Sequence, residues 1–456
     1  MMALAEAARV LDAGLPGSEL HFSGVSTDSR TLRRGELFVA LRGESFDGHA
    51  FLDAARAAGA AAAMVDARFT GKAPLPVLVV PDTKRGLGDL ARYWRSRFAP
   101  VLVAITGSNG KTTTKEMLAA ILRCHAGENG VLATAGNLNN DIGLPLTLLR
   151  LRAAHRYCAI ELGMNHKGEV AYLADIARPT IALVNNAQRE HLEFMRSVEE
   201  VAEENSSVYA ALPADGTAVV NADDALVAVF RRAAAPHRVV EFGLGTGAAV
   251  GGGYVLKQLS SEIRVRTPAG EAAATLAIPG LHNVRNALAA AACAHAAGVA
   301  PRTIGDGLSA FRPYVGRLQV KRSALGATVI DDSYNANPDS VRAAIDILAA
   351  CPAPTVLVLG DMGEVGDKGP EFHREVGAYA RSRDVSALLA IGEASKDAIA
   401  AFGAGGLHAA SLDELLAALR RRATPGATVL VKGSRFMHME RVVASLTDEP
   451  ARAGGH

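Results

Sequence analysis

Cysteine is scarce in this sequence. Four cysteines occur among 456 residues, at Cys124, Cys158, Cys293 and Cys351, and no two of them form a CxxC pair. This count and spacing argue against a disulfide framework and against a structural zinc site. The thiols are expected to be buried and reduced, so we expect a cytoplasmic protein.

Aromatic residues and an excess of either charge are also lacking. Aromatic side chains make up 5% of the chain, and 48 Lys and Arg nearly balance 47 Asp and Glu. So few rings argue against a base-stacking platform for nucleic acid. The even charge argues against nucleic-acid or anionic-membrane binding by the surface as a whole. We therefore expect no nucleic acid and no membrane among its partners. A monomer is a separate expectation that does not follow from composition.

Long apolar runs are missing as well. Residues 1–10 lack a basic start followed by an apolar run, so no secretory signal is expected. The apolar stretches 54–64 and 287–300 are mostly Ala and each contains an ionisable residue, so we expect buried helices there and no membrane span. Hydrophobic residues nevertheless make up 49% of the chain, which is enough for a core. Disorder is expected only at residues 451–456.

The patterning predicts an α/β protein with several domains. The length alone suggests two to four domains. A change of pattern near Pro100 and another near Pro313 predict three parts, residues 1–99, 100–312 and 313–456. In the last two parts, strands alternate with helices, which predicts parallel sheets covered on both faces.

Continuous apolar runs predict the strands and helices of these parts. Strands are expected at residues 37–41, 77–80, 101–105, 157–162, 181–185, 218–221, 328–331, 355–359, 387–391 and 428–431. Helices are expected at residues 51–63 and 87–98, and after 101–105 with Met117, Leu118, Ile121 and Leu122 on one face. Glycines clustered between 243 and 253 predict a loop or hairpin, and hence a small antiparallel piece in the central part.

The strongest motif is a glycine-rich loop between the strand 101–105 and the following helix. It reads Thr106, Gly107, Ser108, Asn109, Gly110, Lys111, Thr112. Backbone N–H groups in such a loop point at anionic oxygens, and the helix N-terminus favours negative charge. Lys111 can reach the β- and γ-phosphates of a nucleotide, and the Thr112 hydroxyl can bind Mg²⁺. Ile105 stands where the strict pattern has Gly, so this is a shortened variant; an ordinary strand-to-helix turn is the alternative.

Two polar residues follow neighbouring predicted strands. Glu161 comes at the end of the strand that begins at 157, directly after Ile160, and His191 follows the strand 181–185. The carboxyl ends of parallel strands meet at one edge of a sheet, so both side chains can reach the same crevice, with Glu161 as a Mg²⁺ ligand. The alternatives are an exposed strand-end glutamate and a structural histidine.

Three further polar segments are candidates for ligand contacts. Asn283 and Asn286 lie three residues apart before an Ala-rich helix, where their amides can pair with a purine edge or cap the helix. The segment 331–338 is dense in polar groups after the strand 328–331. The segment 432–435, Lys-Gly-Ser-Arg, ends the last strand and can bind an anion or form a solvated turn.

Together these motifs resemble the Mur ligase family, the ATP-dependent amide ligases of bacterial cell-wall synthesis, over nearly the whole chain. Residues 106–112 look like the family's phosphate loop, 282–286 like its adenine-side motif, and 316–318, Gly-Arg-Leu, like the segment that starts its C-terminal domain. The resemblance implies an N-terminal α/β domain for the UDP end of the substrate, a central P-loop ATPase domain, and a Rossmann-like C-terminal domain that closes over the site.

Finer motifs resemble the branch that joins D-alanyl-D-alanine to UDP-N-acetylmuramoyl-tripeptide. They lie at residues 25–30, 46–49, 139–143, 331–338, 360–364 and 432–435. The implied partners are that UDP-linked tripeptide, D-alanyl-D-alanine and ATP. One alternative is a ligase similar to folylpolyglutamate synthase, which the segment 26–30 disfavours. The other is a nucleotide-hydrolysing switch protein, which usually carries an Asn-Lys-x-Asp motif that this sequence lacks.

The resemblance also implies roles for individual residues. For catalysis these are Lys111, Arg317 and His191. For ATP binding they are Gly107, Ser108, Asn109, Gly110, Lys111, Thr112, Thr113, Asn283, Asn286, Arg317, Asp332 and Tyr334. For the other substrates they are Ser26, Thr27, Asp28, Ser29, Arg30, Asn139, Asn140, Asp141, Asn335, Asn337, Lys432 and Ser434. For Mg²⁺ they are Thr112, Glu161 and His191.

One position departs from the family pattern. Many members carbamylate a lysine downstream of the histidine, and the carbamate binds a second Mg²⁺. Here Asn205 stands at that position, and no lysine occurs between Lys167 and Lys257. We therefore expect no lysine carbamate, and a second Mg²⁺ held by a neutral amide or water, or no equivalent site.

Overall fold

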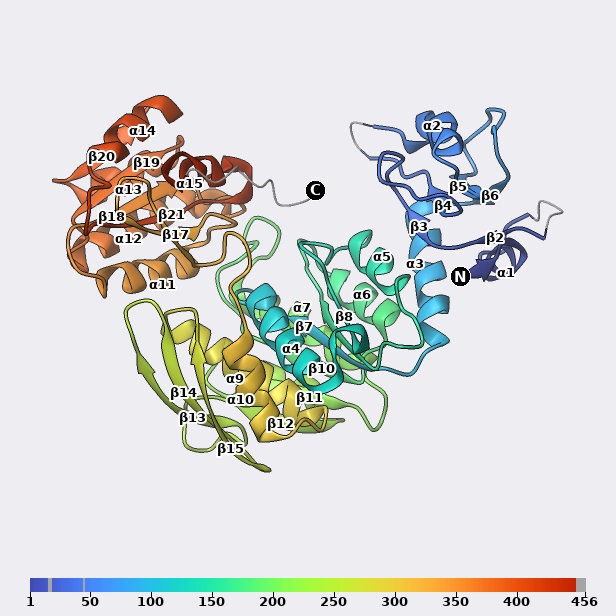
Figure 1. The fold of residues 1–456 in the computed structure, drawn as a ribbon, viewed down its shortest axis with the longest axis horizontal. Coiled ribbons are helices and arrows are strands. Elements are labelled where there is room, and N and C mark those ends of the chain that lie inside the picture. Colours follow the sequence, from blue (N-terminus) through green and yellow to red (C-terminus); the bar gives the residue numbers. More distant parts are fainter. Residues whose placement is uncertain (15–18, 44–45, 448–456) are drawn as a thin grey trace.

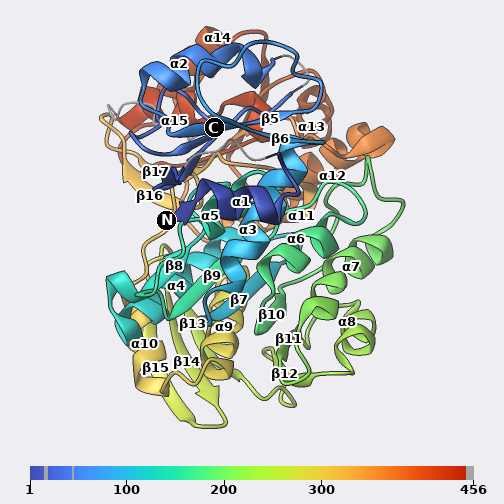
Figure 2. The same cartoon turned by 90° about the vertical axis from the view of Figure 1, so that its right-hand side faces the viewer.

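The computed structural model describes residues 1–14, 19–43 and 46–447. The predicted disordered tail, 451–456, lies outside these ranges. Figure 1 shows three α/β bodies, with the N-terminal one in blue and the C-terminal one in orange and red, both above the central one. Figure 2, turned by 90°, also shows both outer bodies above the central one. The predicted three-domain α/β fold is confirmed.

The N-terminal domain is built on a parallel sheet in the order β3-β4-β5-β6. Its strands are β3 (Val25–Ser26), β4 (Leu37–Val39), β5 (Ala62–Asp66) and β6 (Val77–Val80). The helices are α1 (Leu4–Val10), the 3-10 turn η1 (Gly48–Phe51), α2 (Leu52–Ala57) and α3 (Thr83–Ser96), and β1 (Met2–Ala3) pairs antiparallel with β2 (His21–Phe22). Asp82 caps α3 by accepting hydrogen bonds from the backbone of Lys84 and Arg85.

The predicted helix 51–63 is wrong in its second half. Helix α2 ends at Ala57, and Gly59 follows with φ +91°, a conformation that glycine adopts at little cost. The Ala-rich run then forms β5, which is buried along its whole length between β4 and β6. Alanine content favours a helix, but the strand of a covered parallel sheet is also a continuous apolar run. The expectation of one buried helix over 54–64 is therefore wrong as well.

The central domain contains six parallel strands in the order β12-β11-β10-β7-β9-β8. They are β7 (Val101–Thr106), β8 (Val131–Ala133), β9 (Tyr157–Glu161), β10 (Ile181–Val184), β11 (Thr217–Asn221) and β12 (Arg238–Phe242). The helices are α4 (Lys111–Ala126), η2 (Glu128–Gly130), α5 (Gly143–Leu148), α6 (Glu169–Ala177), α7 (Val198–Ser206), η3 (Ser207–Ala211), α8 (Val227–Ala234), α9 (Leu281–Ala296) and α10 (Pro301–Ala310). The four residues predicted for one face of the helix after β7 are all buried in α4.

An antiparallel sheet completes the central domain, as the glycine cluster predicted. Its strands are β13 (Gly251–Leu256), β14 (Ser261–Thr267) and β15 (Gly270–Leu276). The last three glycines of the cluster, residues 251–253, lie in the edge strand β13 and not in a loop.

The C-terminal domain has a mixed sheet in the order β16-β17-β21-β18-β19-β20. Its strands are β16 (Gln319–Arg322), β17 (Thr328–Asp332), β18 (Thr355–Gly360), β19 (Ala387–Ile391), β20 (Gly406–Ala409) and β21 (Thr428–Lys432), and β16 alone runs antiparallel to its neighbour. The helices are α11 (Pro338–Ala349), η4 (Gly366–Lys368), α12 (Gly369–Ser382), α13 (Ser395–Phe402), α14 (Leu412–Arg420), η5 (Arg435–Met437) and α15 (Glu440–Thr447).

Apolar contacts join the domains as well as filling them. Leu90 and Trp94 of α3 share one buried core with Leu144 and Leu148 of α5. At the other interface, Gly280 precedes α9 and lies against α11, where an added Cβ would come within 2.9 Å of the Ile347 side chain. The N-terminal and C-terminal domains therefore both rest on the central domain through packed side chains. No helix in the part of the chain that the structure describes is long and apolar enough to cross a bilayer.

Candidate functional site

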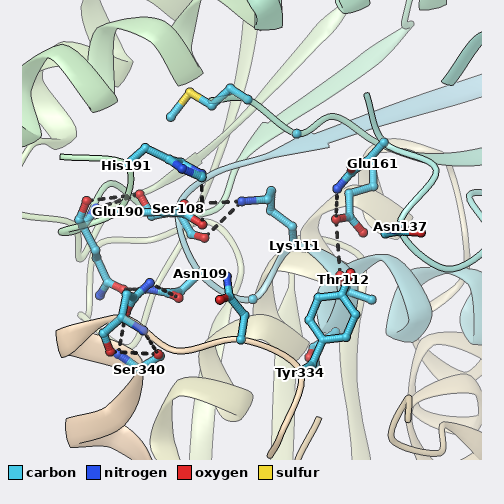
Figure 3. A pocket seen from close by; sticks show the side chains of 18 of the residues that line it. Ser108, Asn109, Lys111, Thr112, Asn137, Glu161, Glu190, His191, Tyr334 and Ser340 are labelled. Carbon is cyan, nitrogen blue, oxygen red and sulfur yellow. Dashed lines mark hydrogen bonds and ion pairs between the residues drawn. The ribbon is translucent and has the colours of Figure 1, made fainter. Parts of the chain in front are cut away.

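A cavity of about 810 Å³ lies where the three domains face one another. Its lining includes Lys84 and Arg85 from α3, the phosphate loop before α4, Asp332 at the end of β17, and Tyr334 just after that strand. Figure 3 shows Lys111 inside this cavity, with His191 on one side and Glu161 on the other. The loops that follow parallel strands thus meet at one crevice, as expected for this class of sheet.

The phosphate loop connects β7 to α4 through two glycines with positive φ. Gly107 has φ +128° and Gly110 has φ +80°. A Cβ added at Gly110 would lie 2.3 Å from Oδ1 of Asn286, so the loop needs glycine there for space as well as for conformation. The Lys111 ammonium donates to the carbonyls of Gly107 (2.5 Å) and Ser108 (3.1 Å). The loop backbone therefore holds the lysine head group beside the helix N-terminus.

Glu161 is arranged as a cation ligand. Its Oε1 accepts hydrogen bonds from the Thr112 hydroxyl (3.2 Å) and from the Asn139 side-chain amide (2.8 Å). Its Oε2 is buried and has no hydrogen-bond partner. Mg²⁺ is usually held by one or two carboxylates together with substrate phosphates and water, so an orphaned carboxylate oxygen beside a phosphate loop fits this ion. Within the described ranges, no three His, Cys, Asp or Glu side chains gather into a cluster that would hold a metal by itself.

His191 lies between two carboxylates from different domains. Its Nε2 is 3.5 Å from Glu190, and its Nδ1 is 2.8 Å from Glu364 of the C-terminal domain. Burial alone would lower the pKa of His191, but these two carboxylates outweigh it and raise the pKa to about 9. Burial likewise opposes ionisation of Glu190, yet Lys111 at 3.4 Å and His191 hold its pKa below the usual range. His191 also has φ +55°, a conformation that non-glycine residues adopt at a cost.

A network of asparagine amides packs against the phosphate loop. Asn286 Oδ1 accepts a hydrogen bond from Asn185 Nδ2 (2.9 Å), and its Nδ2 donates to Asn283 Oδ1 (3.1 Å). Asn283 and Asn286 therefore share one face of α9, as predicted. The alternative of a helix cap is wrong, because Gly280 is the N-cap residue and the Asn283 amide donates to the Pro279 carbonyl instead.

The C-terminal domain contributes a stacked pair and a buried ion pair. The Arg317 guanidinium lies over the Tyr334 ring, 4.1 Å from its centroid. The Lys432 ammonium lies 2.5 Å from Asp332 Oδ2 and donates to the Asn335 carbonyl (2.9 Å). Burial raises the pKa of Asp332 and lowers the pKa of Lys432, and their mutual attraction opposes both shifts.

Most of the predicted site residues line this cavity. They are Ser108, Asn109, Gly110, Lys111, Thr112, Thr113, Asn139, Asn140, Asp141, Glu161, His191, Asn283, Asn286, Arg317, Asp332, Tyr334, Asn335, Asn337 and Lys432. Asn337 also bridges the domains, because its Nδ2 donates to Asn109 Oδ1 at 2.9 Å.

A smaller set of predicted residues lies apart from the lining. Gly107 contributes its carbonyl to Lys111, as described above. Ser434 accepts a hydrogen bond from the Gly363 N–H (2.8 Å) and so positions the chain behind the site. The segment Ser26, Thr27, Asp28, Ser29 and Arg30 belongs to the N-terminal domain outside the cavity, where Asp28 and Arg30 form an exposed ion pair at 2.8 Å.

Asn205 also lies outside the cavity lining. Its side chain is buried in α7, where Oδ1 accepts a hydrogen bond from the Thr106 hydroxyl (2.5 Å) and Nδ2 donates to the Val201 carbonyl (2.9 Å). The Oδ1 contact ties α7 to the end of β7, and the Nδ2 contact stays within α7, so both ends of the amide are occupied.

The sequence did not predict several residues of the site. Gln188, Glu190 and Glu364 line the cavity, and Asn185 and Asn186 support its phosphate loop by donating to the Asn109 carbonyl. Glu190 carries a usable signal, because it directly precedes His191 in the loop after β10. Glu364 ends the motif 360–364, but nothing in its spacing indicates that it meets His191 across the domain interface.

Comparison with known proteins decides the family. Sequence models of three Mur ligase domains match the chain. The catalytic domain of the Mur ligase family matches residues 21–95, the Mur ligase middle domain 105–294, and the glutamate ligase domain 316–435. The chain belongs to the Mur ligase family. The resemblance inferred from the sequence motifs is thereby confirmed.

Individual members of the family match nearly the whole chain. The UDP-N-acetylmuramoyl-tripeptide–D-alanyl-D-alanine ligase of Escherichia coli (strain K12) is 39% identical over 453 residues, which is 98% of each chain. The crystal structure of MurF from Acinetobacter baumannii superposes with a TM-score of 0.90 at 35% identity, covering 98% of this chain and 99% of that one. The MurF ligase of Thermotoga maritima, solved in complex with ADP, has a TM-score of 0.82 at 25% identity, covering 94% and 98%. These names agree with the finer prediction made from the motifs.

Proposed function

We propose that this protein is an ATP-dependent ligase that joins D-alanyl-D-alanine to the terminal carboxylate of UDP-N-acetylmuramoyl-tripeptide in the synthesis of peptidoglycan precursors. The observation that carries the proposal is the match, over 98% of the chain, to a ligase named for this reaction. The cavity supports it, because a phosphate loop, a buried carboxylate and polar residues of a second domain face one another there.

The chemistry follows from the need to activate a carboxylate. The acceptor carboxylate attacks the γ-phosphorus of ATP, forming an acyl phosphate and releasing ADP. The amine of D-alanyl-D-alanine then attacks the acyl carbon, phosphate leaves, and the amine loses its proton. Positioning and neutralisation of charge are the main tasks of the protein in phosphoryl transfer. Lys111 and Arg317 supply fixed positive charge for these tasks, and a closed site limits hydrolysis of the acyl phosphate.

We assign ATP to the phosphate loop and the asparagine network. In this assignment Lys111 faces the phosphates, Asn283 and Asn286 face the adenine side, and Arg317 and Tyr334 complete the nucleotide site. The residues that would hold Mg²⁺ are Thr112, Glu161 and His191, and the ion would neutralise phosphate charge. The orphaned Oε2 of Glu161, with the Thr112 hydroxyl beside its other oxygen, supports the first two of these residues. His191 would have to lose its proton before it could bind the ion, because its pKa is raised to about 9.

We assign the remaining polar residues to the other substrates. The acceptor peptide is expected along Asn139, Asn140 and Asp141, and the dipeptide near Asn335, Asn337 and Lys432. The UDP end is assigned to the segment 26–30, which lies outside the cavity lining. Ser434, which accepts a hydrogen bond from the Gly363 N–H, is assigned to substrate binding with them.

Three broader proposals accompany this function. The domain boundaries are proposed at 99/100 and 312/313, which is supported by the separate sheets on either side. A monomer is proposed because one chain provides the whole cavity. The cytoplasm is proposed as the compartment, because the reaction consumes ATP and the cysteines of the described chain are free thiols. Three of them are buried as expected, whereas the expectation is wrong for Cys124, which is exposed.

A paired-substrate assay tests the proposal. Purified protein is given Mg²⁺-ATP, UDP-N-acetylmuramoyl-tripeptide and D-alanyl-D-alanine, and both ADP and the pentapeptide product are measured. We expect ADP release that requires both acceptor and dipeptide, with one product formed per ADP. ADP release without either substrate would indicate a hydrolysing switch. Product formation with glutamate in place of the dipeptide would indicate a ligase of the folylpolyglutamate type.

A further inference from the structure

Lys115 is fully buried and is not one of the residues that line the cavity. The three residues that its ammonium contacts do not line the cavity either. The Lys115 side chain is 0% exposed. It lies on α4, four residues after Lys111, and neither the family resemblance nor the proposed mechanism uses it. A buried ammonium carries a large desolvation cost unless it is paired and hydrogen-bonded, so its contacts indicate what the residue does.

Among the residues that the structure describes, the Lys115 ammonium contacts Glu116 on α4, Thr134 in the loop after β8, and Tyr314 between the domains. It forms an ion pair with Glu116 and donates a hydrogen bond to the Thr134 carbonyl (2.8 Å). The Tyr314 ring lies 5.7 Å from Nζ, from the segment between the central and C-terminal domains. The ammonium thus fixes the backbone of Thr134 to the helix that starts at the phosphate loop.

Thr134 passes this constraint on to Glu161. The Thr134 hydroxyl accepts a hydrogen bond from the Glu161 backbone N–H (3.0 Å). The Glu161 carboxylate in turn contacts the Thr112 hydroxyl on the first turn of α4. A closed path therefore runs from α4 through Lys115, Thr134 and Glu161 back to α4.

We propose that Lys115 is a positioning residue that sets the Glu161 carboxylate against Thr112 by holding Thr134. The inference rests on the proposed role of Glu161 as a Mg²⁺ ligand. Residues that orient metal ligands from behind typically change metal affinity or activity by about 10- to 100-fold when they are replaced. We expect an effect of that size here, although Lys115 contacts neither substrate nor metal.

Lys115→Met is the first test, because methionine fills similar space without the charge. Its partner Glu116 is 21% exposed, so water can solvate the carboxylate that is left behind and the fold should survive. The readout is Mn²⁺ binding in the presence of ADP, followed by the electron paramagnetic resonance signal of free Mn²⁺. We expect an affinity about 10- to 100-fold lower than in the wild type. The Mg²⁺ concentration for half-maximal ligation should rise in parallel, and the KM of the acceptor should stay within about twofold.

Thr134→Val tests the path, and Thr114→Val is its matched control off the path. Thr134→Val removes the hydroxyl that Glu161 uses and should weaken Mn²⁺ binding as Lys115→Met does. Thr114 is fully buried in α4 and its hydroxyl has no hydrogen-bond partner, so Thr114→Val should leave Mn²⁺ affinity and ligation unchanged. In the double variant Lys115→Met/Thr134→Val, we expect the loss of Mn²⁺ affinity to equal the larger of the two losses seen in the single variants. The reason is that the effects of residues acting through one path are not additive.

Each outcome either supports or overturns the proposed role of Lys115. Wild-type Mn²⁺ affinity in folded Lys115→Met, or additive losses of affinity in the double variant, would overturn the inference. If Lys115→Met fails to fold, Thr134→Val decides, and unchanged Mn²⁺ affinity there would overturn it. If the wild type binds ADP and Mn²⁺ but forms no pentapeptide, the proposed function fails while the variants still test the role of Lys115.

Discussion

Arg189 and Asp339 join two domains through a paired contact. Arg189 lies in the loop after β10, and its Nη2 is 2.6 Å from Oδ1 of Asp339 on the first turn of α11, while its Nε is 3.2 Å from Oδ2. Glu375 binds the other side of the guanidinium at 2.7 Å. Hydrogen bonds from Arg189 hold the pKa of Glu375 below its usual range. This ion pair stands beside Glu190 and His191, so it ties the C-terminal domain to the loop that borders the phosphate site.

Arg189→Met should weaken the contact between the central and C-terminal domains. Arg189 itself does not line the cavity. We expect kcat/KM for ATP to fall roughly tenfold, because interfacial charge pairs of this geometry carry measurable coupling. Arg374→Met is the matched control, since Arg374 pairs with Asp397 at 2.9 Å within the C-terminal domain. Steady-state kinetics of the two variants provide the comparison, and equal effects in both would contradict a role in domain closure.

The C-terminal domain is expected to move onto the central domain when substrates bind. The site is divided, with Lys111 and Glu161 on one side of the residue stretch 311–315 and Arg317 and Tyr334 on the other. Interfaces between domains of one chain are usually modest, so hinge motion is the default expectation. Small-angle scattering should show a smaller radius of gyration with a non-hydrolysable ATP analogue and acceptor than without them. An unchanged radius at demonstrated saturation would favour a preassembled site.

Lys111→Ala should nearly abolish ligation while leaving the fold intact. Loss of a charge contact made in the transition state costs on the order of 3–4 kcal/mol, or about 10²–10³ in rate. The product assay described above gives the rate, and thermal unfolding checks the fold. Lys72→Ala, at an exposed position of the N-terminal domain, should behave as the wild type. Near-normal turnover of folded Lys111→Ala would remove the basis for assigning ATP to this loop.

Ligation should not depend on bicarbonate or CO₂. A carbamate needs a lysine amine, and Asn205 occupies the relevant position with both ends of its amide hydrogen-bonded to Thr106 and Val201. The rate should stay the same when CO₂ is stripped at constant pH and then restored. A reversible loss would mean that a lysine elsewhere in the site is modified.

Asp66 should make the N-terminal domain sensitive to acid. Its side chain is 2% exposed, and a hydrogen bond from Arg42, supported by Arg68, lowers its pKa to about 2. Because the folded pKa lies below the unfolded value, the stabilisation is present above about pH 4 and is lost as the pH falls toward 2. After allowance for screening at the exposed Arg68 side chain, we expect about 1 kcal/mol.

Urea unfolding of Asp66→Asn measures this contribution. The fluorescence of Trp94, the one tryptophan in the sequence, reports on the interface of α3. The variant should be less stable than the wild type at pH 7, and the difference should shrink between pH 5 and pH 3. Asp53→Asn, at an exposed position of α2, is the control. A difference that does not change with pH would mean that Asp66 acts by packing and not by charge.

The sequence predicted most of the parallel strands because a covered strand is a continuous apolar run with clear ends. Residues 101–105, 355–359 and 428–431 are examples, and each was confirmed to within one residue. The same signal failed at β5, because alanine is compatible with both a helix and a strand. There the segment forms a strand because it is buried between β4 and β6. The short strand β8 and the edge strand β12 were missed because their runs are brief or mixed in polarity.

The candidate site was predictable where local chain geometry carries the information. The phosphate loop needs glycine at 107 and 110 and a lysine at the helix start, so its sequence is diagnostic. Arg189, Glu190 and Glu364 carry no such constraint, because any loop can place a charged residue. Lys111, which pairs with Glu190, comes from a distant segment of the same domain. Arg189 and Glu364 meet their partners only when the central and C-terminal domains are assembled.

The packing of α3 on α5 has a consequence for how the protein can be divided. Leu90 and Trp94 of α3 complete the same buried core as Leu144, Leu148 and Val170 of the central domain. A fragment that starts at residue 100 would leave this apolar face open to water, and exposed patches of that kind cause aggregation. The protein chemist who wants the nucleotide-binding half alone should therefore retain α3, because the folding unit begins inside what the sequence presents as the preceding domain.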